Sequence, residues 1–149
     1  MEICRIVALV YVCHAVSAIL HELGHWLAAK KLYGQYEEVR IGNFFCISIG
    51  RKFRISPIIL NGYVSVNQEV VLDSSKRNVV VFFGAGLLVN LILIIAALSL
   101  TICNSAFVYL VWVNIVHIVA GILPVEGTDG YNMIRILSHK SKYDEVDVH

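Results

Sequence analysis

The chain has 149 residues, a length typical of one domain, and 58% of them are hydrophobic while only 15% are charged. Soluble domains carry about a quarter charged residues, so the composition argues against an ordinary soluble protein. The net charge of +1 gives no sign of a basic surface, and we expect no nucleic-acid partner. Without an internal repeat or an obvious linker, the sequence predicts a single domain over residues 1–149. The four cysteines show no CxxC spacing and are interpreted as free thiols: Cys4, Cys13, Cys46 and Cys103.

The first long apolar run covers residues 6–29 and contains Glu22 as its only charged residue, histidines aside. As a helix it is about 36 Å long, against a hydrocarbon core of about 30 Å. We therefore predict a first transmembrane helix here. A cleaved signal peptide is an alternative, with Arg5 as its basic flank and "VSA" at 16–18 as the cleavage site. A very apolar soluble bundle is another, although the run exceeds ordinary buried helices.

Residues 35–70 have the pattern of strands rather than of a helix. "FCISIGRKFRISP" at 45–57 alternates apolar and polar residues around a turn at 50–52, and "ILNGYVSVNQEV" at 59–70 contains an Asn-Gly turn followed by a second alternation. We expect a small β-sheet on, or partly in, the cytoplasmic face of a membrane. An exposed edge strand would be a hazard there unless it had a use.

Two further uncharged runs follow at 78–103 and 104–125. They predict a second transmembrane helix over about 78–103 and a third over about 106–124, joined by a tight hairpin at Asn104-Ser105 and ended by Pro124. The expected fold is an all-α membrane core of three transmembrane helices, with the small membrane-associated sheet between the first two. A loop and tail are expected over 125–149.

The basic residues predict the orientation of these helices. Eight of the twelve lie between the first and second runs, three follow the third run, and only Arg5 precedes the first. Because cytoplasmic segments carry the excess of Lys and Arg, we expect the N-terminus outside and the C-terminus in the cytoplasm. The protein is then a multi-pass integral protein, most simply of the cell membrane.

The first run contains "HELGH" at 21–25. His21 and His25 are four residues apart and share one face of a helix, where they can hold one metal ion, and Glu22 is placed to take a proton from water activated by that metal. Buried polar residues without a metal are the alternative. Ionisable groups inside a membrane span are costly, however, and are by default functional. We therefore predict a zinc site.

A catalytic zinc needs a third protein ligand. The longer pattern HExxHxxGxxH is absent, since Ala28 and Lys31 stand where its glycine and third histidine would be. "VEGTDG" at 125–130 offers two carboxylates near the end of the third run, Glu126 and Asp129. We favour Asp129, because Gly130 beside it allows the backbone to turn close to a metal.

Three motifs resemble those of the site-2 proteases, the intramembrane zinc metalloproteases. They are "HELGH" at 21–25, "NGYVSV" at 61–66 and "LPVEGTDG" at 123–130. A fourth, "AGLLVN" at 85–90, is partial, because Leu87 replaces a proline while Asn90 is retained. Gly121 stands where the family usually has asparagine. The resemblance covers the three-helix core of the family.

The resemblance implies an intramembrane metallopeptidase with a single zinc ion held by His21, His25 and Asp129, and Glu22 as general base. Its substrate would be a transmembrane or signal-peptide-like protein in the lipid bilayer. The strand at Gly62, Tyr63 and Val64 would pair with an extended substrate segment. Asn90 would contact substrate or the developing oxyanion, or alternatively bond between helices.

Two other functions stay open from the sequence alone. One is a catalytically inactive relative that acts as a membrane interaction or immunity protein, and the other is a membrane metal-binding or transport protein. His14 and His117 can line a water path or pack as histidines bonded to neighbours, and Asn114 is expected to make an interhelical contact. Nothing in the sequence indicates the substrate's identity or the oligomeric state.

Overall fold

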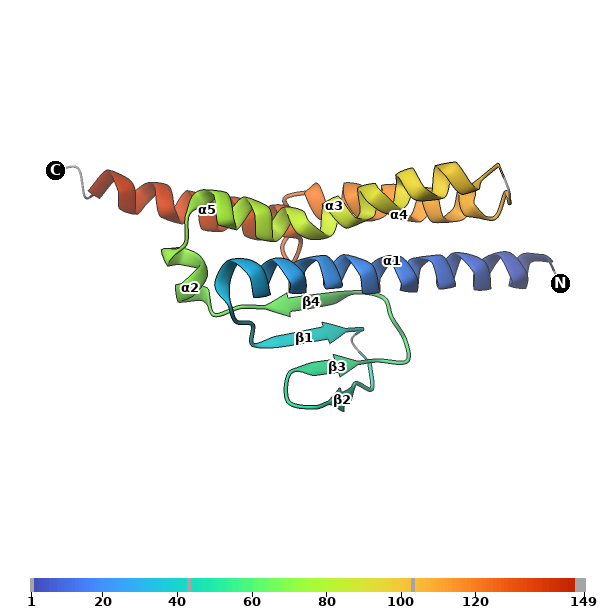
Figure 1. The fold of residues 1–149 in the computed structure, drawn as a ribbon, viewed down its shortest axis with the longest axis horizontal. Coiled ribbons are helices and arrows are strands. Elements are labelled where there is room, and N and C mark those ends of the chain that lie inside the picture. Colours follow the sequence, from blue (N-terminus) through green and yellow to red (C-terminus); the bar gives the residue numbers. More distant parts are fainter. Residues whose placement is uncertain (1, 43, 103, 147–149) are drawn as a thin grey trace.

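The computed structural model describes residues 2–42, 44–102 and 104–146. Its longest helix, α1, lies between a small sheet and the hairpin formed by α3 and α4 (Figure 1). The fold is therefore mostly helical, with the sheet inserted between α1 and α3 in the sequence. In chain order the elements are α1 (Glu2–Tyr33), β1 (Glu38–Ile41), β2 (Ile47–Ile49), β3 (Phe53–Ile55), β4 (Gly62–Ser65), α2 (Gln68–Asp73), α3 (Lys76–Leu100), α4 (Phe107–Ile122) and α5 (Asp129–Val146).

Two helices in the described part of the chain are long and apolar enough to cross a membrane, α1 with 32 residues and α3 with 25. α4 is apolar too but has 16 residues, which is about 24 Å of helix. Large apolar side chains on the outer faces of these helices are exposed, including Leu27, Ile92 and Trp112. Such a surface suits lipid better than water.

Small and polar residues join the helices. Gly24 of α1 lies so close to α3 that a Cβ there would be 2.9 Å from the Ala85 carbonyl oxygen. Two turns earlier in α1, the fully buried Asn114 of α4 donates to the Ser17 hydroxyl at 2.9 Å. This bond confirms the interhelical contact expected for Asn114. Close backbone approach and hydrogen bonds between helices are the means by which helices associate in lipid.

The sheet has the strand order β2-β3-β1-β4, so β4 lies at an edge. The hairpin predicted around residues 50–52 is confirmed, since β2 and β3 pair antiparallel across Gly50, whose φ is +71°. The prediction of a hairpin turn at Asn61-Gly62 is wrong. Gly62 is instead the first residue of β4, which pairs antiparallel with β1, and residues 56–61 connect β3 to β4 across β1.

The sheet lies alongside α1 rather than beyond its C-terminal end (Figure 1). Hydrogen bonds place the connection before β4 beside the N-terminal half of α1, with the Ile59 N–H donating to the Tyr11 hydroxyl at 3.1 Å. Tyr11 precedes Lys30 by about 28 Å along the helix. The non-helical backbone therefore runs beside most of the length of α1.

The segment after Pro124 differs from the expected loop and tail. Residues 125–128 form a turn, and α5 begins at Asp129 and runs to Val146. The Thr128 hydroxyl accepts a hydrogen bond from the Tyr131 N–H at 3.2 Å, as a helix N-cap does. Asp129 in the first turn also complements the helix dipole.

The thiols of Cys4, Cys13 and Cys46 are free, as predicted. The fourth cysteine, Cys103, lies outside the described residues.

Candidate metal centre

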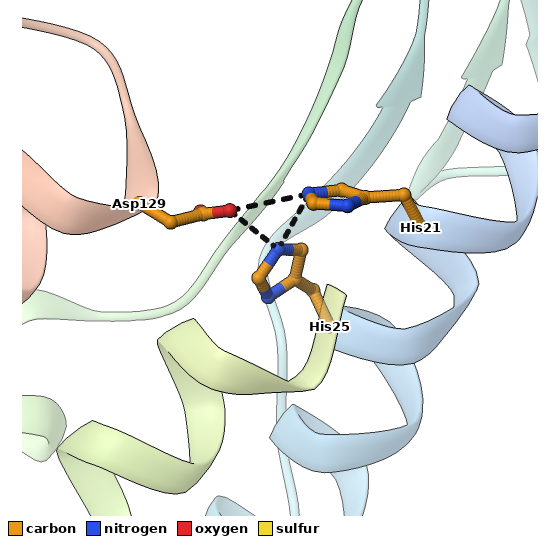
Figure 2. Close-up of side chains that lie close together, drawn as sticks. All are labelled: His21, His25 and Asp129. Atoms are coloured by element: carbon orange, nitrogen blue, oxygen red, sulfur yellow. Dashed lines mark hydrogen bonds and ion pairs between the residues drawn. The ribbon is translucent and has the colours of Figure 1, made fainter. Parts of the chain in front are cut away.

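Two histidines of α1 and one aspartate of α5 meet at one point. His21 and His25, one helical turn apart, approach each other with their Nε2 atoms 3.1 Å apart. Asp129 Oδ2 lies 3.2 Å from each of these nitrogens (Figure 2). Three donor atoms so close together can share one metal ion. Sequence positions more than a hundred residues apart thus supply one candidate site.

The turn after α4 decides which carboxylate reaches the histidines. Glu126 is exposed, while Asp129 at the start of α5 points at the imidazole rings. A Cβ at Gly130 would lie 2.8 Å from the Ile122 carbonyl carbon. Glycine at position 130 therefore allows α5 to begin directly against the end of α4, and this close approach holds Asp129 at the site.

The Asp129 carboxylate is kept ionised by its partners. Burial alone would raise the pKa of Asp129, but the Nε2–H groups of His21 and His25, when these rings are protonated, donate to the carboxylate, and these hydrogen bonds outweigh burial and lower the pKa to about 2. A deprotonated carboxylate is the form that binds a metal ion.

The second nitrogen of His25 fixes the form of its ring. His25 Nδ1 lies 2.8 Å from the Phe82 carbonyl oxygen of α3. A carbonyl can only accept, so Nδ1 carries a proton, and in the neutral ring Nε2 keeps its lone pair. That lone pair is on the nitrogen that faces His21 and Asp129, as a metal ligand requires.

Asn90 of α3 holds the second nitrogen of His21, with the Asn90 amide nitrogen 3.1 Å from His21 Nδ1. In this orientation the Asn90 Oδ1 is buried without a partner in the described part of the chain. Turning the amide over lets Oδ1 accept from Nδ1–H and leaves Nε2 of His21 free for a metal. The donor set therefore fits zinc, with two neutral imidazoles and one carboxylate.

This placement bears on the expected role of Asn90. Its side chain is completely buried behind His21, and it is not among the described residues that line the adjoining cavity. A contact with substrate or with an oxyanion is therefore not supported by the geometry. Asn90 instead bonds between helices, the alternative drawn from the sequence, and its partner is a candidate metal ligand.

Glu22 lies beside the three donors and lines a cavity of about 320 Å³ that opens next to them. Its side chain is buried, and its Oε2 has no hydrogen-bond partner among the described residues. Gly62 of β4 packs against it, since a Cβ there would lie 2.7 Å from Glu22 Cγ. A carboxylate with one free oxygen in a cavity beside a metal site can accept a proton from water.

The predicted docking strand begins at this cavity. Gly62 lines it, and Tyr63 and Val64 follow along β4. β4 pairs with β1 on one side only, so its other edge is unpaired within the sheet. The structure thus brings Gly62, the first of the predicted strand residues, against the candidate base.

Two contributions to the site were not predicted. Gly86 of α3 faces the imidazole rings, and the Phe82 backbone carbonyl fixes His25. The glycine in "AGLLVN" gave a signal, but its partner rings could not be identified from the sequence. His14 and His117 line the cavity and bond to each other, so both features expected of them from the sequence occur together.

A family model described as Peptidase family M50 matches residues 9–105 of the chain. The matched stretch contains His21, Glu22, His25 and Asn90, and it ends before Asp129. No curated protein matches the chain.

Proposed function

The chain belongs to peptidase family M50, the site-2 protease family, and we propose that it is a zinc metalloprotease that hydrolyses peptide bonds in or near transmembrane segments of membrane-bound proteins. The observation that carries this proposal is the convergence of His21, His25 and Asp129 beside the free oxygen of Glu22. The donors cluster at one point instead of following a path, which favours catalysis over metal transport.

His21, His25 and Asp129 would hold the zinc ion. When bound, zinc lowers the pKa of a water molecule and polarises the scissile carbonyl. Glu22 then accepts a proton from the attacking water and returns it to the leaving amine. Phe82 and Asn90 keep the two imidazoles in the orientation that points Nε2 inward.

β4 is the proposed docking site for the substrate. A transmembrane helix shields its own peptide bonds by hydrogen bonding, so it must be extended before hydrolysis. The unpaired edge of Gly62, Tyr63 and Val64 offers backbone groups to such an extended segment. Because Gly62 touches Glu22, a strand added here would pass beside the base.

The membrane arrangement is part of the same proposal. α1, α3 and the shorter α4 cross the bilayer as a three-helix core, with the N-terminus outside and the C-terminus in the cytoplasm. The distribution of basic residues supports this orientation. His21 is then about 13 Å from Lys30 along α1, and the cavity provides the polar space that water needs at this depth.

The test is cleavage of candidate substrates. The full chain would be co-expressed with a panel of transmembrane and signal-peptide-like proteins, and products identified by mass. Wild type should give a product that Glu22→Gln does not, while Glu69→Gln, at an exposed glutamate of α2, behaves as wild type. Equal product from Glu22→Gln would exclude Glu22 as the base. Zinc bound without cleavage across the panel would favour an inactive, binding relative.

A further inference from the structure

A chain of two hydrogen bonds runs along the cavity beside the candidate metal ligands. His117 of α4 bonds through Nε2 to Nδ1 of His14 at 2.9 Å. His14 of α1 bonds through its own Nε2 to the Leu60 carbonyl oxygen, also at 2.9 Å. All three residues line the cavity, and the ring centroid of His117 is 6.4 Å from that of His21. The chain therefore links α4, α1 and the segment before β4.

The direction of these bonds is fixed by the carbonyl at one end. Because the Leu60 oxygen can only accept, His14 Nε2 carries a proton. Neutral His14 then offers Nδ1 as an acceptor, and His117 Nε2 donates to it. His117 thus orients His14, and His14 holds Leu60. Both nitrogens of His14 are engaged, so His14 is not a further metal ligand.

The segment held by His14 has other backbone groups bonded to the same face of α1. Tyr11, three residues before His14, accepts from the Ile59 N–H at 3.1 Å and donates to the Pro57 carbonyl at 3.5 Å. Non-helical backbone at membrane depth is tolerated only where its polar groups find partners. Side chains of α1 supply such partners for Pro57, Ile59 and Leu60.

The position of this segment determines where β4 begins. Gly62, two residues after Leu60, is the first residue of β4 and packs against Glu22. Paired strands have a fixed register, so a substrate strand added to β4 takes its register from β4. A shift of Leu60 would move the scissile bond relative to Glu22 and the metal ligands.

We propose that His14 and His117 are positioning residues for the peptidase reaction. His117 orients His14, and His14 holds Leu60, so that the pair fixes the register of β4, and of the substrate strand, against Glu22. This assignment rests on the proposed function for its substrate strand, whereas the anchoring of Leu60 does not depend on it.

The first test is hydrogen–deuterium exchange of backbone amides in the full chain, reconstituted in lipid nanodiscs. His14→Ala and His117→Ala should each speed exchange of residues 59–65 while leaving bound zinc unchanged. Val116→Ala, which alters the lining of the same cavity without removing a polar bond, should leave exchange as in wild type. Unchanged exchange at 59–65 in both histidine variants would overturn the anchoring, whether or not a substrate is known.

The second test is kinetic and uses a substrate that wild type cleaves. His14→Ala should lower kcat by about 10- to 100-fold, because a small misplacement of the reacting bond is costly. His14→Gln, which keeps a donor for Leu60, should recover most of that loss. The double variant His14→Ala/His117→Ala should be no slower than His14→Ala alone, since His117 acts through His14. Losses that multiply in the double variant would overturn this order of action.

Failure of this proposal is distinguishable from failure of the proposed function. If wild type cleaves none of the substrates, the peptidase function fails and the exchange measurement still decides whether the pair anchors Leu60. If wild type cleaves while both histidine variants match it in exchange and in kcat, the positioning role alone is wrong.

Discussion

Gly86 of α3 lies directly against the imidazole ring of His21: a Cβ at position 86 would be 2.5 Å from His21 Nε2. The same Cβ would collide with His25 Nε2. Real Cβ atoms do not approach other heavy atoms so closely, and both nitrogens belong to the candidate metal site. The absence of a side chain on α3 thus gives the two rings room to face Asp129.

Gly86→Ala should therefore abolish zinc binding and cleavage, because the added methyl group displaces both rings. Gly84→Ala, in the same helix, is the matched control: apart from its chain neighbours and the nearby backbone of α3, no atom of the described residues lies within 4 Å of a Cβ at Gly84. Removing glycine from a helix interior is typically favourable by about 0.5–1 kcal/mol, so Gly84→Ala should retain zinc and be no less stable. Metal analysis of the two purified variants makes the comparison. Full zinc occupancy in Gly86→Ala would contradict the packing described here.

Asn90→Leu should weaken zinc binding by about 10- to 100-fold, because it removes the acceptor that fixes the ring of His21. Asn90→Asp presents only oxygens and should bind zinc more tightly than Asn90→Leu. Competition with a calibrated zinc chelator measures both. Equal zinc affinity in wild type and Asn90→Leu would show that Asn90 only packs.

Asp129→Ala should abolish cleavage and weaken zinc binding, whereas Glu126→Ala should leave both nearly unchanged. The reason is that Asp129 Oδ2 lies 3.2 Å from both histidine nitrogens while Glu126 is exposed. Zinc content and product mass are the readouts. The opposite pattern, with Glu126→Ala inactive and Asp129→Ala active, would move the third ligand to Glu126.

The proposed orientation is tested by cysteine labelling in intact cells. After the native cysteines are replaced by serine, a reagent that cannot cross the membrane should label Ser105→Cys in the α3–α4 hairpin and should not label Arg51→Cys in the β2–β3 turn. Labelling of both after the membrane is permeabilised is the control. The reverse pattern in intact cells would show that the protein crosses the membrane in the opposite orientation.

The candidate metal donors could be predicted from the sequence because their placement follows local rules. His21 and His25 share a helix face by their spacing alone, and Asp129 lies just beyond an apolar run that ends at Pro124. The prediction of Asp129 also required the first and third spans to run in the same direction. Successive spans alternate in direction, so this follows from their order in the sequence. What spacing could not show is the close contact at Gly130 that holds Asp129 in place.

The remaining features depend on contacts between distant segments. Asn61-Gly62 has the local signature of a hairpin turn, but Gly62 pairs with Ile41 of β1, so a long-range partner overrides the local preference. The role of Asn90 depends on which face of α3 meets His21. The start of α5 was missed because Gly130 was interpreted only as a turn residue, although Thr128 is a capable N-cap.

The zinc dependence of proteolysis is the central claim, and one measurement tests it most directly. The protein, reconstituted in lipid vesicles with a substrate that it cleaves, would be stripped of metal by a chelator and then titrated with zinc. Cleavage should stop in the metal-free protein and return as about one zinc ion per chain is bound, with no return in His21→Ala or His25→Ala. Cleavage that continues in demonstrably metal-free protein would contradict the account.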